Sequence, residues 1–242
     1  RILKKESLWD IRDYTYAGWQ LYYADHTDGL LKGCEIHTED GRLVIGKGML
    51  KFHDFIYLLM EEEEVAYQPK NRWQVLKAEF LEDDTNLDYK AYRVRFFLDE
   101  ELELGENQME MCRFYLREGS TLRDSYKNFA DMSTEYDTIN LIYATVAGVG
   151  EKTLHPALLL QFVEELWNMK EKDAADVGIC SLIWNAQGRV ERKVIVAYLC
   201  GKLADHTAEK NDNNRIYGDM ERIIGNKNSR MERKTPKRIV VE

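Results

Sequence analysis

The sequence predicts an α+β fold: a mixed N-terminal part with an antiparallel meander and a packed helix, then a helical bundle and a basic tail. Strand-like and helical patterns alternate with turn dipeptides at first, and the pattern then becomes almost purely helical. The last residues are polar and then strongly basic. We therefore predict an α+β domain over 1–130, a helical bundle over 131–207, and a linker, short helix and basic tail over 208–242.

The composition is that of a globular chain. Hydrophobic residues make up 44% of the 242 residues and charged residues 32%, with only 3 prolines, which argues against a disordered segment. No apolar run approaches the roughly 18 residues that span a bilayer, so we expect no membrane partner. The 4 cysteines form no CxxC pair, and most lie in apolar runs, as reduced thiols usually do. We therefore expect a cytoplasmic protein.

The first predicted elements are a hairpin and a helix. The segment before residue 30 fits either an aromatic helix or a strand interrupted by Gly18, and the sequence does not decide between them. Two β-tolerant runs flank Asp40-Gly41, a dipeptide that is a strong short-range signal for a hairpin. The next segment, 49–67, places its apolar residues at helical spacing, which predicts a helix with a run of four glutamates on its wet side.

Three candidate strands follow, over 72–80, 90–98 and 109–117. The middle one alternates cleanly between two faces, and polar turn segments separate the three. Strands joined by short turns predict an antiparallel meander on which a helix can pack.

Four amphipathic helices are predicted in the second half. The first follows a capping-box pair, Thr134 and Asp137, and covers the apolar positions of 139–146. Proline at a helix start and glycine after a helix end help to delimit the others. Short connections between such helices predict a compact bundle. The other three helices cover about 156–169, 174–186 and 189–203.

One face of the predicted sheet is a candidate binding surface. Cations interleaved with aromatic rings are what phosphate contact and base stacking require. The alternative is a solvated face whose arginines pair with neighbouring Glu or Asp. The residues that we predict on this face are Arg93, Arg95, Phe97, Arg113, Tyr115 and Arg117.

The C-terminal segment is the second candidate surface. Between Arg222 and Arg238 there are 7 cations and 1 anion, a net of +6 in a chain of −9, so the rest of the chain carries −15. A short amphipathic helix over 215–224 is predicted to lead into this tail, and the apolar residues 239–241 could add a strand to a sheet edge. An acidic protein surface, the chain's own body, a nucleic-acid backbone or solvent could surround it. Its candidate binding residues are Lys227, Arg230, Arg233, Lys234, Lys237 and Arg238.

No catalytic signature is complete. The loop from Gly148 to Thr153 resembles a phosphate-binding loop, but Glu151 breaks the G-x-x-x-x-G-K-[ST] spacing. We expect no cofactor and no metal. A metal site would need four side chains of the hairpin and the following helix to converge: Glu35, His37, His53 and Asp54.

Incomplete catalytic motifs, abundant aromatic residues and segregated charge favour a non-enzymatic interaction or adaptor protein, a subunit or regulator of a larger complex. We expect a protein partner or self-association first, and nucleic acid second. Two other classes stay open. One is an acidic inhibitor that imitates nucleic acid, and the other is a phosphate-ester enzyme that uses the degenerate loop or the metal set.

Overall fold

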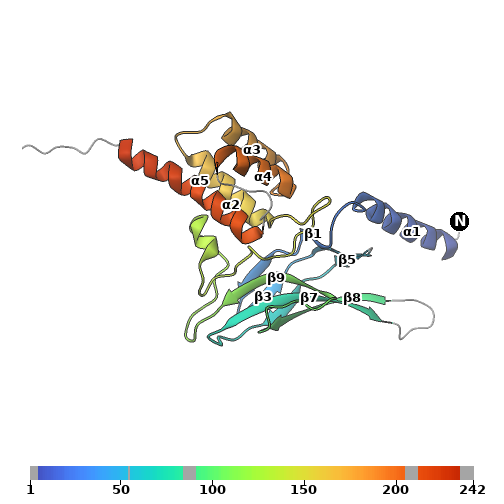
Figure 1. Ribbon diagram of the computed structural model, residues 1–242. Coiled ribbons are helices and arrows are strands. Elements are labelled where there is room, and N and C mark those ends of the chain that lie inside the picture. The colour runs from blue at the N-terminus through green and yellow to red at the C-terminus, as the bar shows by residue number, and fades with distance from the viewer. Residues whose placement is uncertain (1–4, 54, 84–90, 205–211, 235–242) are drawn as a thin grey trace, which may run out of the picture.

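The computed structural model (Figure 1) describes residues 5–53, 55–83, 91–204 and 212–234. It confirms the α+β class, with 32% of the residues helical and 30% in strands. The strands are β1 (Gly29–Gly33), β2 (Ile36–Glu39), β3 (Arg42–Ile45), β4 (Gly48–Phe52), β5 (Phe55–Leu59), β6 (Glu63–Ala66), β7 (Trp73–Asp83), β8 (Ala91–Asp99) and β9 (Gln108–Tyr115). The helices are α1 (Lys5–Tyr22), the 3-10 helix η1 (Ala130–Ser133), α2 (Pro156–Asn168), α3 (Ala174–Asn185), α4 (Arg192–Lys202) and α5 (Asn213–Lys234).

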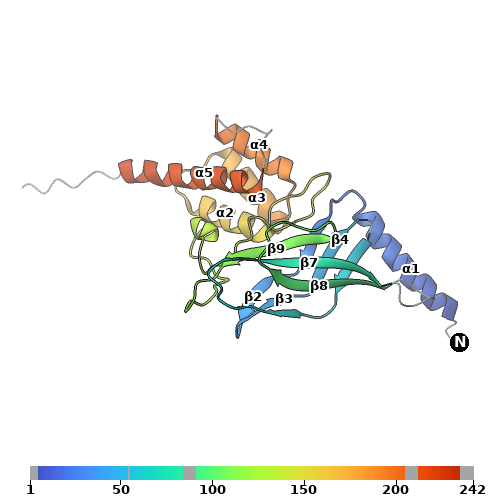
Figure 2. The same ribbon diagram turned by 60° about the horizontal axis from the view of Figure 1, so that its bottom comes forward.

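The strands gather in one part of the molecule, helices α2 to α5 lie to one side of them, and α1 lies at the other end (Figures 1 and 2). In the described residues the strands form three antiparallel sheets, with the orders β1-β4-β5, β2-β3-β6 and β8-β7-β9. One buried cluster continues from the sheets into the helices. Within it, Phe129 packs against Phe162 of α2 and Tyr217 of α5.

The predicted hairpin is confirmed, with β2 and β3 paired on either side of Asp40 and Gly41. Both turn residues have positive φ, 46° and 77°, a conformation that an Asp-Gly dipeptide adopts at low cost. The segment before residue 30 forms helix α1 as far as Tyr22, with Gly18 inside the helix.

The helix predicted over 49–67 is wrong, because β4 and β5 form a second hairpin there. Leu50 and Leu59 pack into the main cluster, whereas Met49 and Ile56 belong to a small cluster on the other face. A hairpin that carries apolar residues on both faces does not alternate between apolar and polar residues, so its pattern imitated helical spacing.

The three later strands are confirmed in position, but their order differs from a meander. β7 is central, and β8 and β9 both pair antiparallel with it. The connection from β8 to β9 therefore returns across β7. It covers Lys77, whose side chain is buried and whose Nζ donates to the Asp99 carboxylate (2.8 Å) and the Glu103 backbone oxygen (2.6 Å). This connection covers part of the face on which we predicted arginines.

Helices α2, α3 and α4 confirm three of the four helices predicted in the second half. The helix expected over 139–146 is wrong, because this segment bridges β9 and β1 instead. Thr145 donates its N–H to the Glu110 carbonyl of β9 (2.8 Å), and its own carbonyl accepts the N–H of Leu30 of β1 (2.9 Å). Most of its apolar residues are buried. In a buried apolar run nearly every position is apolar, so the hydrophobic periodicity does not distinguish a strand from a helix. Helix α5 completes the bundle.

Candidate functional site

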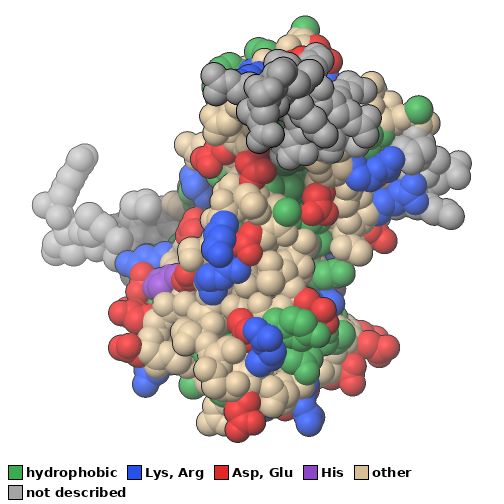
Figure 3. Space-filling model, turned by 90° about the vertical axis from the view of Figure 1, so that its left-hand side faces the viewer, with side chains coloured by type: hydrophobic (Ala, Val, Ile, Leu, Met, Phe, Trp, Pro, Cys, Tyr) green, Lys and Arg blue, Asp and Glu red, His purple; other side chains and the backbone are tan. Residues whose placement is uncertain are grey.

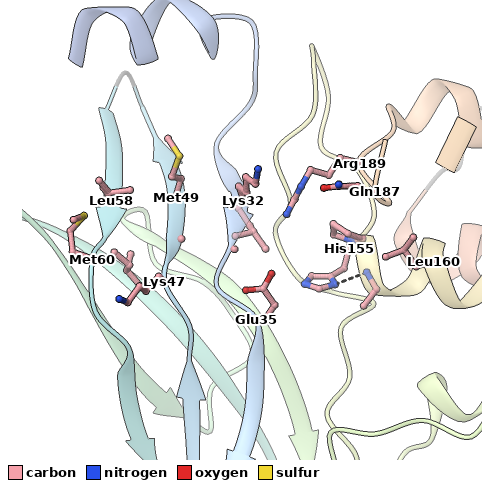
Figure 4. A pocket seen from close by; sticks show the side chains of 16 residues that line it. Lys32, Glu35, Lys47, Met49, Leu58, Met60, His155, Leu160, Gln187 and Arg189 are labelled. Atoms are coloured by element: carbon pink, nitrogen blue, oxygen red, sulfur yellow. Dashed lines mark hydrogen bonds between the residues drawn. The ribbon is translucent and has the colours of Figure 1, made fainter. Parts of the chain in front are cut away.

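A pocket of about 700 Å³ lies between the β1-β4-β5 sheet and the start of α2 (Figure 4). This volume is in the range of small-molecule sites. Apolar side chains of β4 and β5 form one side, polar side chains from the helical part form the other, and the segment after β1 lies between them. The side chains labelled in Figure 4 are Lys32, Glu35, Lys47, Met49, Leu58, Met60, His155, Leu160, Gln187 and Arg189.

Arg189 faces this pocket because of the way α3 ends. Gln187 and Gly188 have positive φ, 51° and 77°, and the N–H of Gly188 donates to the Ile183 carbonyl (2.8 Å), as in a Schellman cap. A Cβ on Gly188 would lie 2.7 Å from the Pro156 backbone oxygen. Glycine at this position therefore lets the end of α3 pack closely on the start of α2. The next side chain, Arg189, lies at the pocket wall.

The Arg189 guanidinium is half-buried, and no hydrogen bond or ion pair holds it within the described part of the chain. Burial lowers its pKa, and the charge of Glu35 acts in the opposite direction. A guanidinium nevertheless stays protonated in proteins. Lys32 and Lys47 also line the pocket, and both are exposed. The polar side therefore presents a half-buried positive charge that no direct ion pair neutralises in the described residues, on a chain whose net charge is −9.

His155 forms part of the same wall and caps α2. Its Nδ1 accepts the N–H of Ala157 (3.2 Å), the role of an N-cap side chain. Burial and, to a lesser extent, the charge of Arg189 lower the pKa of His155 to about 4. The ring is therefore neutral near pH 7. Because Nδ1 accepts a bond, the proton lies on Nε2, which can donate to a ligand.

The apolar side of the pocket is open to solvent. Leu58 is 59% exposed and Met60 67%. Met49 and Leu160 are half-buried and line the same space. Unbranched thioether side chains adapt their shape to an apolar partner. The pocket thus offers an adaptable aliphatic surface opposite a positive charge.

The predicted sheet arginines lie on one face, but carboxylates accompany them. Tyr115 of this face donates its hydroxyl to the Asn71 backbone oxygen. Arg95 lies 5.1 Å from the ring centroid of Phe97, and Arg93 lines a second pocket beside β5. This arrangement corresponds to the alternative in which the arginines pair with neighbouring acids. The ion pairs are Arg95 with Glu79, Arg113 with Glu110, and Arg117 with Asp137.

The basic segment is helical as far as Lys234, so the short helix predicted over 215–224 continues further. Buried residues anchor the first half of α5, and its ribbon then extends beyond the bundle (Figures 1 and 2). At 3.6 residues per turn, the four cations of the second half fall within about 120° of its circumference: Lys227, Arg230, Arg233 and Lys234. Lys237 and Arg238 lie outside the described residues, as do residues 239–241.

Figure 3 views the body from the side towards which α5 extends. Acidic and basic side chains are interspersed on the described part of this face. No large field of one sign covers the described part of this face.

The loop that resembles a phosphate-binding loop uses most of its backbone N–H groups in hydrogen bonds within the protein. A loop that cradles phosphate needs several N–H groups free to converge on an anion. In the loop from Gly148 to Thr153, four N–H groups have internal acceptors. Gly148 donates to the Thr27 hydroxyl (3.3 Å) and Val149 to the Glu191 carboxylate (2.7 Å). Gly150 donates to the Asp25 carbonyl (3.0 Å) and Thr153 to the Val146 carbonyl (3.1 Å).

The proposed metal set is not assembled in the described residues, where no three His, Cys, Asp or Glu side chains are placed to hold a metal ion. Glu35, His37 and His53 are therefore not brought together. Asp54 lies outside the described residues.

No family model, curated protein or solved structure matches this chain. Among the described helices, none combines the length and apolar character needed to cross a bilayer. The sequence did not indicate the pocket, because Lys32, His155 and Arg189 are far apart in the chain. The glycine that follows α3 was the available signal, since it ends that helix beside α2.

Proposed function

We propose that the protein is a non-enzymatic adaptor that joins two protein partners through helices at opposite ends of its body. The observation that carries this proposal is the placement of α1 and α5, which extend in different directions from the packed core (Figures 1 and 2). Two separated helices can engage two partners without steric competition. The two helices also differ in chemistry, which suits them to different partners.

Helix α1 has an apolar face that the body leaves exposed. Tyr14 is 81% exposed, Leu21 80% and Tyr22 72%. At 100° per residue these positions lie within about 100° of the helix circumference. Tyr16, on the other side, packs against Phe55 of β5, with ring centroids 5.6 Å apart. An exposed apolar helix face of this kind fits the groove of a partner protein.

Helix α5 has the opposite chemistry. Its first half is anchored by buried residues such as Ile216 and Met220, and its second half carries four cations on one side. A charge cluster on a helix that extends from its domain steers an oppositely charged partner. We propose an acidic protein surface as this partner and nucleic acid as the competing class.

We place the adaptor in a reducing compartment, the cytoplasm. All 4 cysteines are free thiols. Cys34, Cys112 and Cys180 are buried, and Cys200 is exposed. Free thiols of this kind persist where disulfides do not form.

The test is affinity capture from native extract followed by mass spectrometry, with three variants. In the α5 variant, Lys227, Arg230, Arg233 and Lys234 are replaced by Gln. In the α1 variant, Tyr14, Leu21 and Tyr22 are replaced by Ser. The matched control neutralises four exposed lysines of the body and changes the net charge by the same amount as the α5 variant: Lys127, Lys152, Lys170 and Lys193 to Gln.

We expect one set of acidic proteins to be lost with the α5 variant alone, and a different set to be lost with the α1 variant alone. Capture from nuclease-treated extract should be unchanged. If both variants and the control retain the same proteins, the adaptor proposal is wrong. If capture through α5 disappears on nuclease treatment, nucleic acid is its partner instead.

A further inference from the structure

We propose that the pocket between the β1-β4-β5 sheet and α2 binds an aliphatic monocarboxylate. Arg189 and the proton on Nε2 of His155 would hold the carboxylate, and Met49, Leu58 and Met60 would cover the chain. This inference is independent of the adaptor proposal, which concerns the two helices at the ends of the body.

The head group is inferred from the state of Arg189. Charged side chains that lose water in a fold are normally paired. Buried Lys77 obeys this rule through Asp99 and Glu103. Arg189 is half-buried and lines the pocket without such a partner in the described residues. A carboxylate can accept two parallel N–H bonds from a guanidinium. It would supply the direct ion pair that exposed Glu35, which acts on Arg189 only through its charge, does not make.

The charge of the head group follows from its neighbours. Lys32 and Lys47 are exposed, so solvent and salt screen their contribution. Glu35 lines the same pocket and is exposed as well, so solvent and salt also screen its charge. Among the charged residues that line the pocket, only Arg189 is half-buried. The desolvated part of the site therefore balances one negative charge, which favours a carboxylate over a phosphate dianion.

The chain is inferred from the opposite wall. Leu58 and Met60 are more than half exposed and lie beside Met49 (Figure 4). Apart from His155, the residues that line this pocket contribute no aromatic ring. Flexible aliphatic and thioether side chains pack well against a methylene chain, and they offer no planar surface on which an aromatic ligand could stack.

The test is isothermal titration calorimetry of the full chain with sodium decanoate below its aggregation concentration. Decanol has the same chain without the charge, acetate has the charge without the chain, and decyl phosphate carries a different head group. We expect decanoate to bind, and decanol, acetate and decyl phosphate each to bind at least roughly tenfold more weakly.

Two variants and one control complete the experiment. Arg189→Gln removes the charge, and Leu58→Glu places a negative charge on the exposed apolar wall. Each should weaken decanoate binding by roughly tenfold or more. Arg72→Gln is the matched control, because Arg72 is an exposed arginine that directly precedes β7 and does not line the pocket. It should bind decanoate like the unmodified chain, and circular dichroism should confirm that all variants are folded.

The other outcomes contradict the proposal. Absence of decanoate binding to the unmodified chain at millimolar concentration overturns it. Equal binding of decanol, or unchanged binding by Arg189→Gln, would mean that only apolar surface is involved. Tighter binding of decyl phosphate would overturn the assignment of a carboxylate.

Discussion

At the scale of single residues, Lys77 and Arg189 differ in how their charge is balanced. Lys77 is 1% exposed and donates to a carboxylate and a carbonyl. These bonds tie the connection between β8 and β9 to the centre of the sheet. Arg189 is half-buried and lacks a comparable partner in the described residues. Lys77 therefore stabilises the fold, whereas Arg189 is placed to bind a ligand.

Replacing Lys77 by Met should lower the free energy of unfolding by about 1–3 kcal/mol, because Asp99 and the Glu103 carbonyl lose a charged donor. The exposure of Asp99 limits the loss. Urea unfolding measures it. Lys152→Met, at an exposed lysine, is the control and should change stability by less than about 0.5 kcal/mol. Equal effects of the two substitutions would contradict the role given to Lys77.

His155 should make stability depend on pH. Its pKa is lowered from 6.5 to about 4 in the folded chain, so between these values the unfolded chain binds a proton that the folded chain does not. Stability therefore falls as the pH decreases through this window. Asn at position 155 keeps an N-cap acceptor and cannot titrate. Relative to His155→Asn, the unmodified chain should lose about 1–2 kcal/mol between pH 7.5 and 4.5. If the free energies of unfolding of the two chains, measured with urea, depend on pH in the same way, this prediction is contradicted.

At the scale of elements, close backbone approaches fix where the sheets and helices meet. Gly48 of β4 lies against Cys34, and an added Cβ would lie 2.4 Å from its Sγ and 2.5 Å from its backbone nitrogen. Gly188 holds the end of α3 against the start of α2 in the same way. Glycines at these two contacts therefore shape both walls of the pocket.

Gly48→Ala should destabilise the protein by about 2 kcal/mol or more, because neither the strand nor Cys34 can move away freely. Gly178→Ala provides the contrast. No atom lies within 4 Å of a Cβ at Gly178, which is in α3. Alanine there should stabilise the helix by about 0.5–1 kcal/mol. Thermal unfolding that moves in the same direction for both variants would be inconsistent with these contacts.

Truncating the chain after Gly225 should leave the body folded. The last buried residue of α5 whose side chain is described is Ile224, so the body keeps its contacts. We expect a change in Tm of no more than about 4 °C. Truncation after Asp212 removes Ile216, Tyr217 and Met220 from the core and should lower the Tm far more or prevent folding. Similar Tm values for the two truncations, measured by circular dichroism, would contradict this division of α5.

The elements that the sequence predicted correctly carry a local signal. The Asp40-Gly41 turn and the alternating strand β8 are set by their own residues. The segments 49–67 and 139–146 were assigned wrongly because their apolar residues are buried by elements far away in the chain, and this burial removes the period. The pocket could not be predicted for the same reason, since distant segments form its two walls.

At the scale of the whole molecule, charge and apolar surface are separated. The residues outside the basic segment carry a net charge of −15, whereas the segment from Arg222 to Arg238 carries +6. Helix α5 carries part of this segment away from the body, and α1 presents exposed aromatic residues at a different end (Figure 1). We infer that the body acts as a spacer between two binding helices.

The most direct test of the adaptor proposal is native mass spectrometry of the complexes captured by the full chain. We expect one assembly that contains the chain and both partner classes. The α1 variant and the α5 variant should each reduce it to a different binary complex. If only binary complexes form and the two partners displace each other, the helices do not act as independent binding sites and the adaptor proposal is contradicted.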